Sequence, residues 1–114
     1  MTSAPVYVSI TGLRLKGLRH APRFWWHAIR SMIQARAAPG NRKAEARTIE
    51  GVHHTLTVWI DEEAMRHFLR SGAHLKAMKA FRDIAMGSTL GFTTDLPPDW
   101  SAVHELWRTK GKVV

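Results

Sequence analysis

The sequence contains no cysteine, which removes several kinds of chemistry at once. Disulfide bonds, thiol nucleophiles and cysteine-ligated metals are all excluded. No apolar run approaches the roughly 20 residues of a membrane-spanning helix. The N-terminal stretch MTSAPVYVSI also lacks the charged and apolar regions of a signal peptide. We therefore expect a cytoplasmic protein without a membrane span.

Acidic residues are scarce, and none precedes Glu45. The chain has 17 Lys and Arg residues against 9 Asp and Glu residues, which gives a formal net charge of +8. Such a surface attracts anions in general: nucleic acid, an acidic membrane surface or an anionic small molecule. Neither a zinc-finger spacing nor an RNP-like aromatic strand accompanies the charge, so the sequence does not favour nucleic-acid binding.

The 114 residues are enough for one core, and we expect a single domain over residues 1–114. Alternating apolar residues predict strands, and apolar residues spaced by three or four predict helices. Strands are expected at 6–15, 42–50, 52–60 and 87–95. Helices are expected from Arg23 to the stop at 37–40, from Asp61 to Gly87 with a break at Ser71-Gly72, and after Asp99.

This order is β-α-β-β-α-β with a C-terminal helix, which predicts an α+β fold of the ferredoxin-like type. The helices of that fold lie on one face of the sheet. Tyr7, Thr55, Thr57 and Trp59 share one strand face, and we assign it to the uncovered side. A second copy is expected to cover it, so that a homodimer closes an α/β barrel around a cavity.

The helix from Arg23 carries an apolar stripe that we expect to be buried: Trp25, Trp26, Ile29, Met32 and Ile33. At least one of the two tryptophans is expected in the core. Arg23, His27 and Arg30 lie on another side of this helix. They are interpreted as a solvated face, with an anion site as the alternative.

The break at Ser71-Gly72 draws attention to His74, which follows in the first turn of the restarted helix. Glycine inside a helix costs about 1 kcal/mol relative to alanine, so the break has a purpose. Ser71 is expected to cap the new helix. The helix dipole favours a neutral imidazole near its N-terminus, and His74 is a candidate base or hydrogen-bond donor. The alternative is that His74 only locks the kink.

Other residues offer two interpretations each. His53 and His54 are adjacent on a strand, so they point to opposite faces and cannot chelate one metal ion together. With no HxH or HxxxH spacing, no metal site is predicted. Trp59 can form a flat wall for an aromatic or polyene ligand, or it can anchor a dimer interface.

The stretch HTLTVWIDEEAMRHFLRSGAHLKAM, residues 54–78, resembles the dimeric α/β-barrel proteins of the antibiotic-biosynthesis-monooxygenase type. It is most similar to small members related to spheroidene monooxygenase. The matching features are Thr55 to Trp59, the acids at 61–63, and Ser71, Gly72 and His74. The resemblance implies the fold more firmly than the reaction, because related proteins differ widely in activity.

Two departures from that group are informative. Its quinone-forming oxygenases carry an asparagine four residues before the strand tryptophan, where this chain has Thr55. Its haem-degrading members carry Asn, Trp and His at positions that correspond here to Thr11 or Gly12, Phe68 and Met78. The haem-degrading motif is therefore not matched, although His74 lies one turn from the ligand position.

We hypothesise a monooxygenase-like protein that binds an apolar or aromatic compound in a cavity. The expected binding residues are Tyr7, Ser9, Thr11, Thr55 and Trp59, with His74 as the catalytic candidate. One alternative is a non-catalytic dimeric interaction protein whose cavity is filled by its own side chains. A second alternative is a haem-binding protein; the sequence itself requires no cofactor.

Overall fold

One antiparallel sheet organises the chain. The computed structural model describes residues 4–113, without the side chains of Ala73, His74 and Val113. The strands are β1 (Val6–Leu15), β2 (Asn41–Ile49), β3 (Val52–Trp59), β4 (Ala85–Thr94) and β5 (Lys112–Val113), in the spatial order β2-β3-β1-β4-β5. The first four have the ferredoxin-like arrangement, which confirms the predicted α+β fold. The short β5 was not expected.

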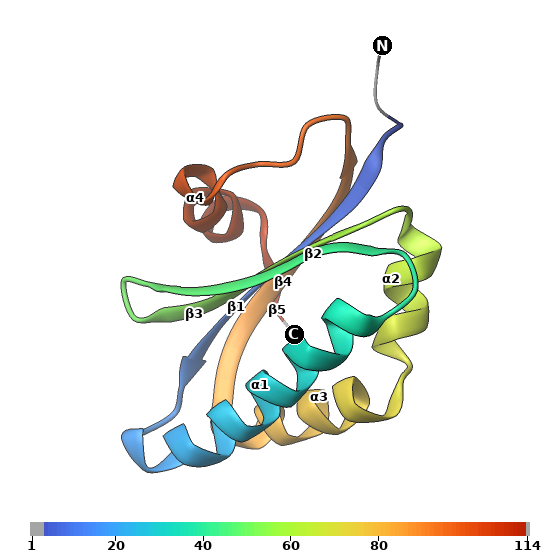
Figure 1. Cartoon of the computed structure of the whole chain (residues 1–114). Coiled ribbons are helices and arrows are strands. Elements are labelled where there is room, and N and C mark those ends of the chain that lie inside the picture. Colours follow the sequence, from blue (N-terminus) through green and yellow to red (C-terminus); the bar gives the residue numbers. More distant parts are fainter. Residues whose placement is uncertain (1–3, 114) are drawn as a thin grey trace.

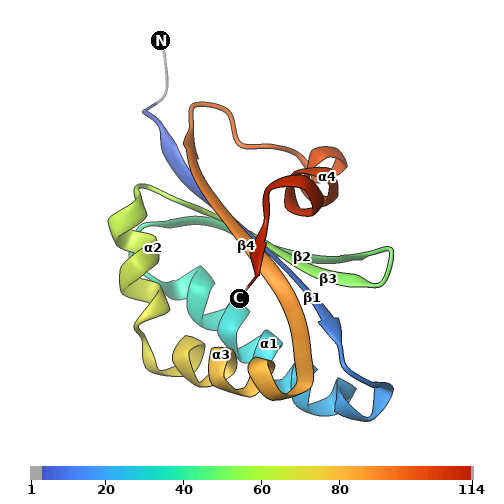
Figure 2. The ribbon, with the colours of Figure 1, turned by 180° about the vertical axis from the view of Figure 1, so that it is seen from behind.

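The helices lie on both sides of this sheet (Figures 1 and 2). On one side are α1 (Ala21–Ala37), α2 (Glu62–Leu69) and α3 (Gly72–Ile84), while α4 (Trp100–Lys110) crosses the other side. A short 3-10 helix, η1 (Leu18–His20), joins β1 to α1. Within residues 4–113, no helix is long and apolar enough to cross a membrane.

Local sequence signals set several element boundaries as predicted. Glu50 and Gly51 both have positive φ, 50° and 78°, and form the tight turn between β2 and β3. Asp61 caps α2 by accepting a hydrogen bond from the Ala64 amide at 2.9 Å. Asp99 caps α4 through the amide of Ser101 at 3.0 Å.

The helix break occurs where expected, but for a different reason. Ser71 does not cap α3 with its side chain; its hydroxyl donates instead to the carbonyl of Phe68 at 2.6 Å and so ends α2. Gly72 has open space where a Cβ would lie, and its φ is outside the left-handed region. No close contact therefore requires glycine at this position.

The α4 side of the sheet holds a tightly packed apolar core. Val8, Ile10, Leu56, Val58 and Val103 are all buried there. Trp100 and Trp107 of α4 pack against the same cluster, as their spacing on one side of that helix predicts. This face is therefore sheltered within a single chain.

The assignment of the two faces was wrong. The side with Tyr7, Thr55 and Trp59 lies under α1, α2 and α3 of the same chain and is not left for a second copy. The alternation of side chains along the strands shows which residues share a face. Both faces carry apolar groups, however, so the alternation does not show which face the helices cover.

The buried side of α1 was also predicted wrongly. Phe24, Ser31 and Ala35 are its buried residues, while both Trp25 and Trp26 are exposed. The physical reason lies in the neighbouring helix: α1 packs along α3, whose buried residues Ala77 and Ala80 are small. Small residues on both helices permit close approach, so the bulkier side chains turn outward.

Candidate functional site

A cavity of about 960 Å³ lies between the sheet and the layer of helices α1, α2 and α3. All five predicted binding residues belong to its lining: Tyr7, Ser9, Thr11, Thr55 and Trp59. They project from the central strands β1 and β3, which are paired so that Tyr7 lies opposite Trp59 and Thr11 opposite Thr55. The structure thus places them together, inside one protomer and not between two.

Tyr7 and Trp59 form one end of the cavity. Trp59 is fully buried and packs against Phe68 of α2 at 5.3 Å between ring centroids. Its indole Nε1–H is buried without a hydrogen-bond partner in the described part of the chain. Burial raises the pKa of Tyr7, the carboxylate of Glu62 raises it further, and Arg66 opposes the shift. Both groups are therefore neutral donors that a ligand can use.

His53 forms the other end, and sequence reasoning missed it as a cavity residue. It lies between Phe24 and Trp25 of α1, at 5.0 and 5.1 Å between ring centroids. Its Nδ1 is 2.8 Å from the Thr48 hydroxyl of β2. Burial lowers the pKa of His53, so the imidazole is neutral at pH 7. The alternation of β3 placed His53 on the Trp59 face, and this signal was available from the sequence.

The wall between these two ends is made of hydroxyl side chains. The Thr11 and Thr89 hydroxyl oxygens are 3.3 Å apart, across the pairing of β1 with β4. Thr89 also donates to the Ile10 carbonyl at 3.3 Å. These short side chains satisfy themselves locally and leave room beside the sheet, which is why the cavity is not filled.

The cavity opens at two edges, marked by lining residues that are also exposed. On one side these are Trp25, Ile29 and Ile33 of α1; on the other they are Met86 and Thr89 of β4. Because β2 and β4 lie on opposite sides of the central strands, a ligand can enter beside either of them.

Gly91 keeps space for the Tyr7 hydroxyl. A Cβ on Gly91 would overlap the phenol oxygen of Tyr7 and lie only 2.8 Å from its ring carbon Cζ. The absence of a side chain at this position of β4 therefore lets Tyr7 lie across the strand. Gly91 is a positioning residue for that end of the cavity.

The catalytic candidate His74 lies in the first turn of α3, but its side chain is outside the described residues. Its role stays a prediction. Among the side chains that the structure describes, no three histidine, aspartate or glutamate residues come together in a way that could hold a metal ion.

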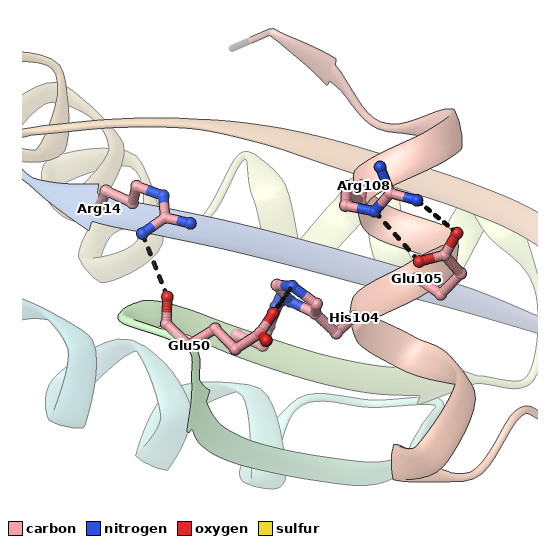
Figure 3. Close-up of polar contacts among 6 residues, drawn as sticks. Arg14, Glu50, His104, Glu105 and Arg108 are labelled. Atoms are coloured by element: carbon pink, nitrogen blue, oxygen red, sulfur yellow. Dashed lines mark hydrogen bonds and ion pairs between the residues drawn. The ribbon is translucent and has the colours of Figure 1, made fainter.

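A pair of histidines, His54 and His104, lies on the α4 side of the sheet, beside the contacts of Glu50 that Figure 3 shows. His54 is 1% exposed, and its Nδ1 lies 3.3 Å from the Thr11 carbonyl. Since that nitrogen must donate, Nε2 accepts from Nδ1 of His104 at 2.8 Å. The other nitrogen of His104 contacts Glu50 at 2.9 Å, and Arg14 donates to the Glu50 carbonyl at 3.2 Å. The network ties the β2–β3 turn to α4.

Several solved structures share this arrangement of strands and helices. SnoaB, a cofactor-independent oxygenase from Streptomyces nogalater, is 18% identical and has a TM-score of 0.68 over 80% of this chain and 94% of that one. A proposed antibiotic biosynthesis monooxygenase from Nitrosomonas europaea is 12% identical, with a TM-score of 0.70 over 88% of this chain and 96% of the other.

A third structure, a proposed antibiotic biosynthesis monooxygenase from Bacteroides thetaiotaomicron, has a TM-score of 0.69 at 14% identity, over 82% of this chain and 93% of that one. The chain has the fold of the antibiotic-biosynthesis-monooxygenase-like proteins. Neither a protein-family model nor a curated protein matches its sequence. The likeness is therefore one of fold, and the chemistry has to be argued from the cavity.

Proposed function

We propose that the chain binds an elongated apolar or aromatic molecule in this cavity and oxidises it with molecular oxygen, as a monooxygenase-like protein. The observation that carries the proposal is the cavity of about 960 Å³, with mainly apolar and aromatic walls and a few polar groups on the sheet. Small-molecule sites commonly have this size and composition. The space also argues against the alternative in which the chain's own side chains fill it.

The shape of the cavity supports a long ligand. Its lining includes both His53 and Trp59, at opposite ends of β3. Six residues of extended strand span about 20 Å. Tyr7, the indole N–H of Trp59 and His53 lie near the two ends, the hydroxyl side chains of the sheet line the wall between them, and apolar side chains of the helices face that wall. An extended polyene or a fused aromatic system that carries oxygen at an end would match this distribution.

The proposed reaction needs a base, a hydrogen-bond donor and an apolar wall for the substrate ring. A neutral histidine, His53 or the predicted His74, removes a proton from a hydroxyl group on the substrate ring. The resulting anion gives electrons to molecular oxygen at a ring carbon, and a carbon–oxygen bond forms. The imidazolium then returns its proton to the terminal peroxide oxygen, which gives a hydroperoxide. Loss of water then leaves a quinone, so one oxygen atom enters the product and the other leaves as water. On an elongated substrate, Tyr7 donates a hydrogen bond to an oxygen at the end remote from His53, where Trp59 with Phe68 forms the stacking wall.

The test uses 1-naphthol, an electron-rich hydroxyarene small enough for the cavity. We expect saturable quenching of tryptophan fluorescence, uptake of one oxygen molecule per 1-naphthol and formation of 1,4-naphthoquinone and water. Thr55→Leu extends an apolar side chain into the cavity and should weaken binding by roughly tenfold or more. His53→Gln should lower the rate of oxygen uptake more than it lowers binding.

The matched control is Thr93→Leu, the same substitution on the same face of the sheet but outside the cavity lining. It should bind 1-naphthol as the unmodified chain does. Equal binding by both leucine variants would place the ligand elsewhere and overturn the proposal. Binding without oxygen uptake would leave the cavity as a binding site and assign the chain to the non-catalytic class.

The haem-binding alternative and the homodimer both stay predictions. The first depends on the side chain of His74. The second has lost the argument on which it depended, because the Tyr7 and Trp59 face is covered by helices of the same chain.

A further inference from the structure

The outer side of α1 carries an apolar stripe that its own chain does not cover. We define the α1 stripe as Trp26, Ile29 and Ile33, whose exposed fractions are 60%, 55% and 62%. At about 100° per residue these side chains point away from the buried Phe24, Ser31 and Ala35. Leu18 of η1, which precedes α1 in the chain, is 89% exposed.

Positive charge flanks the α1 stripe. The same helical spacing puts Arg23 and Arg30 along one edge. Arg36 lies along the other edge, where its Nε–H donates to the Ala44 carbonyl at 3.0 Å. The guanidinium of Arg30 lies 5.3 Å from the centre of the Trp26 ring. The neighbouring helix α3 adds three exposed basic residues against one exposed acid: Lys76, Lys79 and Arg82 against Asp83.

We propose that α1 docks on an anionic lipid bilayer, with the α1 stripe in the interface and the flanking arginines against the headgroups. A helix that lies in the plane of a membrane has this pattern of an apolar strip, a tryptophan and basic edges. Arginine can bury its aliphatic stem while its charged end stays with phosphate groups. The absence of any acid before Glu45 matches a negatively charged surface.

Two other occupants fit this face less well. In a twofold contact between two copies through α1, Arg23, Arg30 and Arg36 would meet the same residues of the second copy, with no acid on either α1. Nucleic acid would require the positive charge at the centre of the surface, where phosphates lie. Here Ile29 and Ile33 occupy the centre, and they offer no hydrogen bonds.

The docking has a consequence for the cavity. Ile29 and Ile33 line its mouth as well as the α1 stripe, so the docked helix would bring that mouth against the lipid. An apolar ligand could then enter without crossing water. This consequence rests on the proposed function, whereas the docking itself does not. Vesicle binding and 1-naphthol binding are therefore measured separately.

The experiment is flotation of the full chain with vesicles made of equal parts phosphatidylcholine and phosphatidylglycerol, compared with phosphatidylcholine alone. We expect binding to the anionic vesicles that falls with added salt, and at least tenfold weaker binding to the neutral ones. Ile33→Gln should weaken binding to the anionic vesicles by roughly tenfold, because it removes one buried aliphatic side chain.

Matched controls separate docking from general effects. Leu96→Gln removes an exposed apolar residue from the loop before α4, and it should leave vesicle binding unchanged. Arg30→Glu and Lys110→Glu change the net charge equally, but Lys110 is on α4, across the sheet (Figure 1). Only Arg30→Glu should weaken binding strongly, by roughly tenfold.

The proposal is overturned if the chain does not float with anionic vesicles, or if Lys110→Glu weakens binding as much as Arg30→Glu does. It is also overturned if light scattering without lipid shows a dimer that Ile33→Gln dissociates, since the face then belongs to a second copy. Binding of a DNA duplex that Arg30→Glu abolishes, in the absence of vesicle binding, would assign the face to nucleic acid. Binding of 1-naphthol by Arg30→Glu, which lies outside the cavity lining, in the absence of flotation would separate the cavity from the docking face.

Discussion

The two faces of the sheet come from the same four strands but end in opposite states. On the α4 face, Val8, Ile10 and Leu56 are fully buried and pack directly against a helix. The residues between these along the strands point to the α1–α3 face. Many of them are short hydroxyl side chains, which leave a cavity there. The α4 face holds the fold together by close packing, whereas the cavity face leaves part of its surface free to contact a ligand.

The largest expected effect comes from a pair of neighbouring residues on the two faces. Leu56→Ala should lower the free energy of unfolding by about 3 kcal/mol, because it leaves a hole in the packed core. Thr55→Ala, one residue earlier and on the cavity face, should lower it by about 0.5 kcal/mol or less. Urea denaturation followed by circular dichroism measures both. Equal losses would show that the cavity face is packed as tightly as the α4 face.

Replacing each of two glycines by alanine should give the next largest difference in folding stability. A Cβ on Gly12 would overlap the Trp107 indole and lie 2.9 Å from Cε1 of His54, two rings held by their neighbours. Gly12→Ala should therefore cost about 2 kcal/mol of stability. Gly91→Ala displaces only the phenol end of Tyr7, so a loss of about 1 kcal/mol or less is expected. A larger loss for Gly91→Ala in the same urea titration would contradict the comparison.

The smallest effect at neutral pH concerns His54. Burial lowers the pKa of His54; the Thr11 carbonyl opposes the shift, and the charges of His104, Arg14 and His53 add to it. Since the unfolded chain then binds a proton more readily than the folded chain, stability is full above the usual histidine pKa of about 6.5 and falls as the pH drops below it.

The melting temperature should fall between pH 8 and pH 5. His54→Gln should make the melting temperature depend less steeply on pH, while it lowers the melting temperature at pH 8. His67→Gln, which changes an exposed histidine on α2, is the control and should keep the slope of the unmodified chain. A slope unchanged by His54→Gln would mean that His54 is not the group responsible.

Much of the architecture followed from local signals. The two-residue turn at Glu50 and Gly51 fixed the pairing of β2 with β3, and Asp61 and Asp99 marked the starts of two helices. The five predicted binding residues line one cavity, because Tyr7, Thr11 and Trp59 share a strand face whichever way that face points, and their role in binding stays a prediction. Turns, caps and alternation act between residues close in sequence, so a single sequence contains them.

The errors share one cause. The bulky stripe of α1 was expected inside, yet Ala35 and Ser31 are buried, because they meet the small residues Ala77 and Ala80 of a helix far along the chain. His53 is a different case: alternation along β3 already placed it on the Trp59 face, and only its contacts with Phe24 and Thr48 come from other elements. Hydrophobicity ranks side chains for burial, but the fit between two particular helices decides which side is buried.

The sequence by itself determined the four long strands, the four α-helices, their order and the grouping of side chains on each strand face, since these depend on backbone preferences and periodicity. Only the tertiary structure decided which face the helices cover, where the cavity lies and which side of α1 meets solvent. Those choices depend on packing between residues distant in the chain, where shape as well as hydrophobicity sets the free energy.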